Sequence, residues 1–251
     1  MSDLRDRRKL PYVEVTAATL KWYGCATMFF YSLSMTVVQN GLLHVNQFSN
    51  TQLREMWVAD PDLMVLSSWA AVFQLLGGLA IPVFAFLLVE GFIHTQNYRA
   101  YLLRMVGFAL LSEIPFDFAM SGKLFDWTSQ NMLFTLSIGL VMLYGLRLFA
   151  AGKSVKLLIV AAGVLWSVLM KAQFGLCMVL LIAVYYLLKD HKAKLWISGT
   201  ISLMYVTGPV SNFVLKRYNH QRGSQSNKYL FYLLYPLHLL ILGVITRCIT
   251  S

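Results

Sequence analysis

Three carboxylates, Glu90, Glu113 and Asp117, and the imidazole of His94 lie in apolar surroundings within residues 81–135. Glu90 and His94 are four residues apart, as are Glu113 and Asp117, so each pair would share one face of a helix. An ionisable group within a membrane costs about 2.5 to 3.5 kcal/mol on insertion scales, and such groups usually have a function. The spacing of Glu90 and His94 suits a carboxylate that orients an imidazole acting as a general base.

Each pair also has a purely structural interpretation. Glu90 and His94 could form a charge cluster at a helix end with Arg99 or Arg104, which follow closely in the sequence. The second pair, Glu113 and Asp117, could instead form a buried hydrogen-bonded cluster with the Gln130–Asn131 pair or with a carbonyl freed near Pro115. The residues alone leave both interpretations open.

His238 is a second candidate base. It lies in the nearly unbroken apolar run YLFYLLYPLHLLIL, beside Pro236. A lone imidazole there could face a cavity as a base, or it could be a packing histidine with satisfied hydrogen bonds. The remaining histidines, His44, His191 and His220, lie in polar segments and are interpreted as ordinary loop residues.

The composition predicts that these groups are held by membrane helices. Hydrophobic residues make up 58% of the chain and charged residues 13%, which is typical of a polytopic membrane protein. The net charge of +10 lies in short clusters between apolar runs, as the positive-inside rule expects. We therefore expect membrane lipids, and not nucleic acid, as partners. The three cysteines predict neither a disulfide framework nor a metal site.

The apolar runs predict an all-α bundle of about eight transmembrane helices. We expect one integral membrane domain over residues 1–251, with residues 1–16 as a basic cytoplasmic segment. A short interfacial helix from residue 63 would precede the second span, and Pro82 would kink that span. The predicted spans cover residues 17–43, 69–89, 105–120, 131–146, 157–170, 174–188, 195–215 and 229–249.

The charged loops predict the orientation of the bundle. With the N-terminus in the cytoplasm, the basic loops at 94–104, 147–156 and 189–194 all fall on the cytoplasmic side. The basic loop at 216–228 would fall outside in an eight-span chain. Either one predicted span is wrong, or this loop binds something acidic, such as lipid headgroups or a charged substrate.

Four stretches resemble the TraX family of bacterial integral-membrane proteins. They are IPVFAFLLVEGFIHTQNYRAYLLR, FALLSEIPFDFAM and QNMLFTLSIGL, in the family's order and spacing, and the terminal YLFYLLYPLHLLIL. The best-known family member acetylates the N-terminus of a conjugative pilin. The family's motif positions are matched here by Glu90, Gly91, His94, Thr95, Tyr101, Arg104, Glu113, Pro115, Phe116, Asp117, Gln130, Asn131 and Thr135.

The resemblance implies acetyl transfer from cytoplasmic acetyl-CoA to a peptide amine or an envelope sugar, at the bacterial cytoplasmic membrane. In this interpretation His94 or His238 takes the acceptor's proton, assisted by Glu90, Glu113 and Asp117. Gln130 or Asn131 donates to the developing oxyanion. No metal is expected. The CoA phosphates are attracted by basic side chains at the cytoplasmic face, Arg99 and Arg104 with Arg147 or Lys153.

Two family positions differ in this chain. Tyr31 and Ser32 stand where the first span of the family usually has an Asp-His pair, and Gly78-Leu79-Ala80-Ile81 lacks a family arginine. If the missing histidine is the family's base, this chain uses His94 or His238, has changed its reaction, or is inactive. The alternative function is therefore a non-catalytic transporter or assembly protein on the same scaffold.

Overall fold

The prediction of an all-α chain is confirmed. The computed structural model describes residues 14–149, 152–223 and 228–250, and this part is helical apart from short connections and two isolated β-bridges. Residues 1–13 of the predicted basic N-terminal segment lie outside the described residues.

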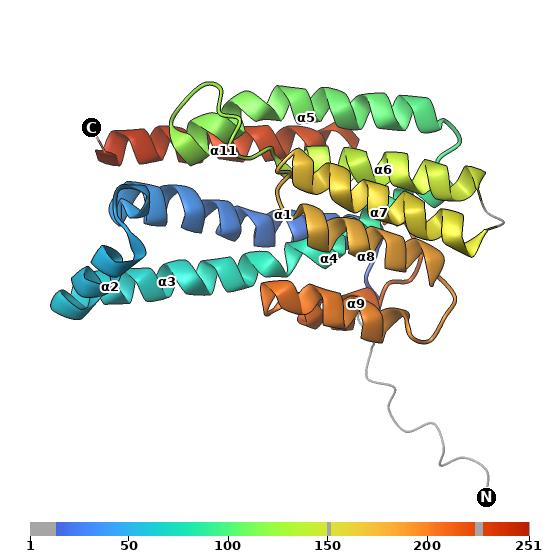
Figure 1. Ribbon diagram of the computed structural model, residues 1–251, viewed down its shortest axis with the longest axis horizontal. Helices are drawn as coiled ribbons and strands as arrows, with labels where there is room; N and C mark the ends of the chain where they lie inside the picture. Colours follow the sequence, from blue (N-terminus) through green and yellow to red (C-terminus); the bar gives the residue numbers. More distant parts are fainter. Residues whose placement is uncertain (1–13, 150–151, 224–227, 251) are drawn as a thin grey trace, which may run out of the picture.

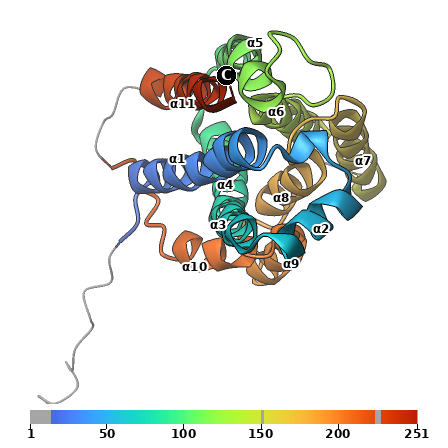
Figure 2. The same ribbon diagram turned by 90° about the vertical axis from the view of Figure 1, so that its left-hand side faces the viewer.

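The long helices run back and forth along one common direction (Figure 1). α4 lies in the middle of the bundle with the other helices around it (Figure 2), and ten of its fifteen residues are buried. The elements are α1 (Ala17–Leu33), the π-helix η1 (Ser34–Leu42), η2 (Val45–Gln47), α2 (Asn50–Ala59), α3 (Pro61–Gly78), α4 (Ala80–His94), α5 (Tyr98–Ser121), α6 (Met132–Leu148), α7 (Lys153–Leu169), α8 (Gly175–Leu187), α9 (Lys194–Ser202), η3 (Leu203–Tyr205), η4 (Gly208–Val210), α10 (Ser211–Leu215) and α11 (Lys228–Thr250).

Capping residues fix where several helices begin and end. Thr16, Asp60, Asn97 and Asn131 each accept a hydrogen bond from a backbone amide in the first turn of the helix that follows. Gly122 ends α5 with φ of 73°, a left-handed conformation that suits glycine at a helix C-terminus. Helix boundaries therefore follow local side-chain chemistry.

Among the described residues, two helical stretches are long and apolar enough to cross a membrane, judged by length and composition. They are Pro61–His94, counted through the break between α3 and α4, and Tyr229–Thr250. The apolar helices α6 and α8 are shorter. At 1.5 Å per residue α8 is about 20 Å long, less than the hydrocarbon thickness of about 30 Å. The structure therefore supports membrane-type helices without confirming eight spans.

The second predicted span has the wrong boundaries. α3 begins at Pro61, directly after the capping Asp60, so no separate interfacial helix precedes residue 69. The helix is interrupted at Leu79, whose N–H bonds the Leu76 carbonyl over 3.3 Å. Pro82 lacks the N–H that would bond the carbonyl four residues earlier, which accounts for an interruption just before it.

The predicted span over residues 195–215 is wrong. α9 ends after nine residues, and the chain reverses near Val206, whose φ is 46°. α10 then returns beside α9, because Asn212 donates to the Leu195 carbonyl over 3.1 Å and hydrogen-bonds Ser198 over 3.3 Å. In one continuous helix, residues 195 and 212 would be about 26 Å apart. α9 and α10 thus form a helical hairpin that enters and leaves at the same end.

This hairpin covers the break in the long α3–α4 stretch. The Thr207 hydroxyl donates to the Leu75 carbonyl, whose usual helical donor, the N–H of Leu79, bonds elsewhere. The Ser211 hydroxyl donates to the Leu79 carbonyl over 2.7 Å. The Leu75 carbonyl, which has lost its helical donor in apolar surroundings, needs such a partner, since an unpaired carbonyl is costly. The turn of the hairpin is therefore held at the break by these two hydrogen bonds.

The reversal also explains the fourth basic loop. The backbone of Val15, at the start of α1, bonds Arg217 over 3.1 Å and Asn219 over 3.0 Å. The loop that carries these residues therefore lies at the end of the bundle that holds the α4–α5, α6–α7 and α8–α9 connections (Figure 1). An error in one predicted span, the first explanation left open by the sequence, is therefore sufficient to account for the position of this loop.

The break leaves no room for side chains at Gly77 and Gly78. A Cβ at Gly77 would lie 2.3 Å from Tyr31 Cβ, and one at Gly78 would lie 2.7 Å from the Tyr205 carbonyl oxygen. We expect Gly77→Ala to destabilise the fold by about 1–3 kcal/mol, because the contact includes the Tyr31 Cα and α1 must shift to relieve it. Thermal unfolding of the purified protein in detergent measures this.

Gly107→Ala in α5 is the matched control. A Cβ there meets no heavy atom within 4 Å, so helix propensity alone applies and favours alanine by about 1 kcal/mol. Equal melting temperatures for the two variants would contradict the close approach of α1 to α3.

Candidate functional site

A cavity of about 1010 Å³ lies between α1, α4, α5, α6, α11 and the loop after α10. We call it the α1–α11 cavity. Its lining follows one face of α1 from Ala17 to Phe29, a rise of about 18 Å. It is therefore an elongated cavity running along the bundle rather than a compact hole.

The outer end of the α1–α11 cavity is polar and basic. Lys21, Arg104 and Arg222 line it, and so do His94 and His220, whose side chains are 61% and 67% exposed. This end therefore opens to solvent beside the basic loops. The inner end is mostly apolar and is lined by Met28, Phe29, Met132, Leu136, Tyr235 and His238.

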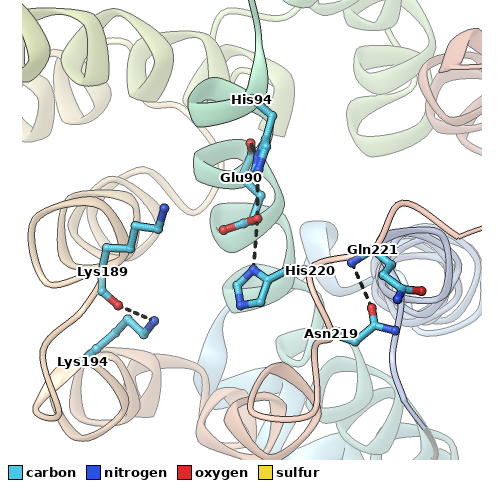
Figure 3. Close-up of polar contacts among 7 residues, drawn as sticks. All are labelled: Glu90, His94, Lys189, Lys194, Asn219, His220 and Gln221. Carbon is cyan, nitrogen blue, oxygen red and sulfur yellow. Dashed lines mark hydrogen bonds and ion pairs between the residues drawn. The ribbon is translucent and has the colours of Figure 1, made fainter.

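Glu90 lies between two imidazoles at the outer end (Figure 3). Its Oε2 is 3.8 Å from His94 Nδ1 and 3.7 Å from His220 Nδ1. The hydrogen bond of His94 goes to the backbone carbonyl of Glu90, over 2.8 Å, and not to its carboxylate. Burial, and next the Glu90 carboxylate, raise the pKa of the nearby Tyr218 phenol. Glu90 and His94 therefore lie close together, but the carboxylate does not orient the imidazole by a hydrogen bond, and His220, interpreted from the sequence as an ordinary loop residue, lies at a similar distance from it.

His238 lies at the inner end with both ring nitrogens engaged. Nδ1 is 2.9 Å from the Leu234 carbonyl and Nε2 is 3.0 Å from Ser32 Oγ. A carbonyl only accepts, so these partners assign the proton to Nδ1, and Nε2 accepts from the Ser32 hydroxyl. Ser32 is fully buried. His238 is thus oriented by its own helix and bonded to the first helix of the chain.

Glu113 and Asn131 form a hydrogen-bonded cluster away from the cavity lining. The Asn131 side-chain amide donates to Glu113 and, over 2.8 Å, to the Ala109 carbonyl, while its backbone N–H donates to Glu113 over 3.3 Å. Its Oδ1 caps α6 at Leu133. Glu113 therefore forms the hydrogen-bonded cluster with Asn131 that the structural interpretation expected. Asn131 has its amide hydrogens engaged, and its predicted oxyanion role stays a prediction.

Asp117 and Gln130 form hydrogen bonds to loops. Asp117, near the C-terminus of α5, bonds the α5–α6 loop, and Gln130, just before α6, bonds the α7–α8 turn. Asp117 accepts the Asp126 N–H over 2.8 Å, and hydrogen bonds, first from Ser121, lower the pKa of Asp126. The Gln130 backbone bonds Lys171 over 3.1 Å and Gln173 over 2.9 Å. Neither Asp117 nor Gln130 lines the α1–α11 cavity.

The predicted phosphate-binding residues are divided in the same way. Arg104 lines the cavity, and its Nε is buried without a hydrogen-bond partner among the described residues. Arg99, Arg147 and Lys153 are exposed outside the cavity lining, and the Arg147 guanidinium lies 6.0 Å from the Phe92 ring centroid. From the predicted set, Glu90, His94 and Arg104 thus line the outer end of the α1–α11 cavity and His238 lines its inner end.

Sequence reasoning missed Lys21, His220 and Arg222 as residues that line the cavity, and Ser32 as the hydrogen-bond partner of His238. Lys21 was visible only as a charge inside an apolar run, and Ser32 only as a difference from the family pattern. His220 and Arg222 lie on the loop that the wrong span had placed on the opposite side. In the described part of the chain, no group of three or more His, Cys, Asp or Glu side chains is arranged to hold a metal ion.

Comparisons with known proteins agree with the resemblance in the sequence. A family model described as TraX protein matches residues 18–246. The probable fimbrial assembly protein FimC, serogroup H1, of Dichelobacter nodosus is 27% identical over 199 residues, which is 67% of this chain and 80% of that protein. No solved structure matches. Because the family match covers nearly the whole chain, the protein belongs to the TraX family.

Proposed function

We propose that the protein is a multi-pass membrane acyltransferase that takes an acetyl group from cytoplasmic acetyl-CoA. The acceptor would be a peptide amine or an envelope sugar. The observation that supports this most is the α1–α11 cavity, which runs from a basic, solvent-open end to an imidazole at its inner end. Acyl-CoA has the same polarity, with phosphates at one end and a thioester at the end of a flexible arm.

The outer end would bind the phosphates of the donor. Lys21, Arg104 and Arg222 give three positive charges at the cavity, and the free Arg104 Nε offers a hydrogen-bond donor to an anion. Arg99, Arg147 and Lys153 would act at longer range by attracting the donor to this end. The elongated inner part suits the arm that carries the thioester.

The inner end would carry out the acyl transfer. His238 Nε2 is the unprotonated nitrogen, because Nδ1 is protonated toward Leu234, so Nε2 can take a proton from the group that donates to it, which in this structure is the Ser32 hydroxyl. His94 is largely exposed at the outer end, about one cavity length away. We therefore favour His238 as the base and assign His94 to the binding of the donor's charged end, with the Glu90 carboxylate beside it favouring a protonated imidazole.

We propose seven membrane crossings in the bacterial cytoplasmic membrane. α1 with η1, α3 with α4, and α5, α6, α7, α8 and α11 would each cross once, and the α9–α10 hairpin would return to its own side. All four basic loops then lie in the cytoplasm, as the positive-inside rule expects. Lipids would contact the exposed apolar side chains, such as those of Leu110, Leu157 and Leu165.

A second candidate is a non-catalytic assembly protein. The Dichelobacter nodosus relative is named a probable fimbrial assembly protein, and this chain matches most of its length. Binding and turnover of acetyl-CoA separate the two functions, since an assembly scaffold needs neither.

Removing charge at the outer end should weaken donor binding. We expect Lys21→Gln with Arg222→Gln to raise the dissociation constant for CoA at least tenfold, and high salt to narrow the difference from the natural protein. Lys189→Gln with Lys192→Gln is the control, because it removes two exposed charges at the same end but outside the cavity. Titration calorimetry measures both. Equal weakening by the two double variants would indicate only a general field effect.

Removing the inner imidazole should abolish turnover without abolishing binding. We expect His238→Ala to reduce release of CoA from acetyl-CoA by about 10² to 10⁴, the usual contribution of a positioned base. His94→Ala should reduce it less than tenfold. A larger loss for His94→Ala than for His238→Ala would move the base to the outer end.

The side of the membrane on which each loop lies can be tested by labelling. In a variant lacking Cys25, Cys177 and Cys248, single cysteines at Asn97 and Asn219 should react with an impermeant maleimide from the same side of sealed vesicles. A cysteine at Lys123 should react from the other side. Labelling of positions 97 and 219 from opposite sides would restore a full span between residues 195 and 215.

A further inference from the structure

We propose that Ser32 is the first acceptor of the acyl group, so that the protein works through a covalent acyl-serine. This inference rests on the proposed function. It starts from one contact, in which Ser32 Oγ lies 3.0 Å from His238 Nε2 while Nδ1 is held by the Leu234 carbonyl. A nucleophile, a base within hydrogen-bond reach and a third group that orients the base together define an activated hydroxyl.

The direction of the proton supports Ser32 as the nucleophile. His238 Nε2 accepts, so the hydroxyl hydrogen of Ser32 already points at the base. A different acceptor in the cavity would have to displace Ser32 before it could give its proton to Nε2. The simplest use of this base is therefore deprotonation of Ser32.

The position of Ser32 suits an ester that must survive until the acceptor arrives. Met28 and Phe29, one helical turn earlier on α1, line the inner end of the cavity together with His238. Ser32 itself is fully buried beside them. Ser32 does not itself line the cavity, so a thioester at the inner end would reach the hydroxyl only after the side chains beside it shift, and an ester formed at this buried position would be shielded from water.

The reaction balances without any further reagent. Ser32 Oγ attacks the thioester carbonyl carbon and His238 Nε2 takes the hydroxyl proton, after which the C–S bond breaks and the CoA thiolate takes that proton. In the second half the acceptor's amine or hydroxyl attacks the serine ester and gives its proton to Nε2. The C–Oγ bond then breaks, and Ser32 Oγ recovers the proton.

The test is a rapid acid quench of the full-length protein with isotopically labelled acetyl-CoA, followed by peptide mass spectrometry. We expect one acetyl group on the Ser32 peptide, labile to hydroxylamine. Ser32→Ala should lose the label and slow CoA release at least 100-fold while binding CoA as before. Ser32→Cys should instead carry a thioester, which hydroxylamine cleaves faster.

Ser34→Ala is the matched control. Ser34 is also fully buried, but its hydroxyl donates to the Ala70 carbonyl over 2.7 Å and has no contact with an imidazole. It should keep the label at Ser32. Full turnover by Ser32→Ala, with no acetyl group on the Ser32 peptide of the natural protein, would overturn the covalent step and leave the proposed acyltransferase standing.

A donor-independent reagent separates the two proposals. A small fluorophosphonate reacts with activated serines whatever the natural donor is. It should modify Ser32 in the natural protein and not in His238→Ala. If acetyl-CoA neither binds nor turns over, the proposed function fails, and labelling of Ser32 by the fluorophosphonate still supports an activated serine. No labelling would overturn the nucleophile as well.

Discussion

The structure depends on satisfying the backbone hydrogen bonds at the break between α3 and α4. Pro82 interrupts the long α3–α4 stretch within apolar surroundings, and the freed Leu75 carbonyl is bonded by Thr207 from a distant hairpin. Gly77 and Gly78 allow α1 and the turn of this hairpin to approach the break. An unpaired carbonyl here would be costly, and its hydrogen bond with Thr207 holds the α9–α10 hairpin against the break.

That contact determines the composition of the candidate site. Because the hairpin reverses, the following loop returns to the start of α1 and pairs with Val15. His220 and Arg222 then lie at the outer end of the α1–α11 cavity, beside Glu90 on the central helix. A straight span in place of the hairpin would have carried both residues to the opposite end.

The polar residues of the family motifs divide into two groups. Asn131 hydrogen-bonds Glu113 and so joins the start of α6 to α5, and Gln130 joins the same segment to the α7–α8 turn. Glu90 and His94 instead line the cavity, with Arg104. Residues that look alike in sequence, polar groups in apolar runs, therefore serve either packing or the cavity. Ser32 is another polar residue in an apolar run. It stands where this chain differs from the family pattern, and it hydrogen-bonds His238 of the last helix.

The sequence by itself determined the helical class and most helix positions, and its candidate residues included Glu90, His94, Arg104 and His238, which line the cavity. These follow from local patterns, since hydropathy, caps and charge spacing act within a few turns of the chain. Only the tertiary structure decided that residues 195–215 form a hairpin, because its turn is stabilised by carbonyls 132 residues away in sequence. Likewise, Ser32 and His238 are 206 residues apart, so their hydrogen bond arises from the packing of the first helix near the last.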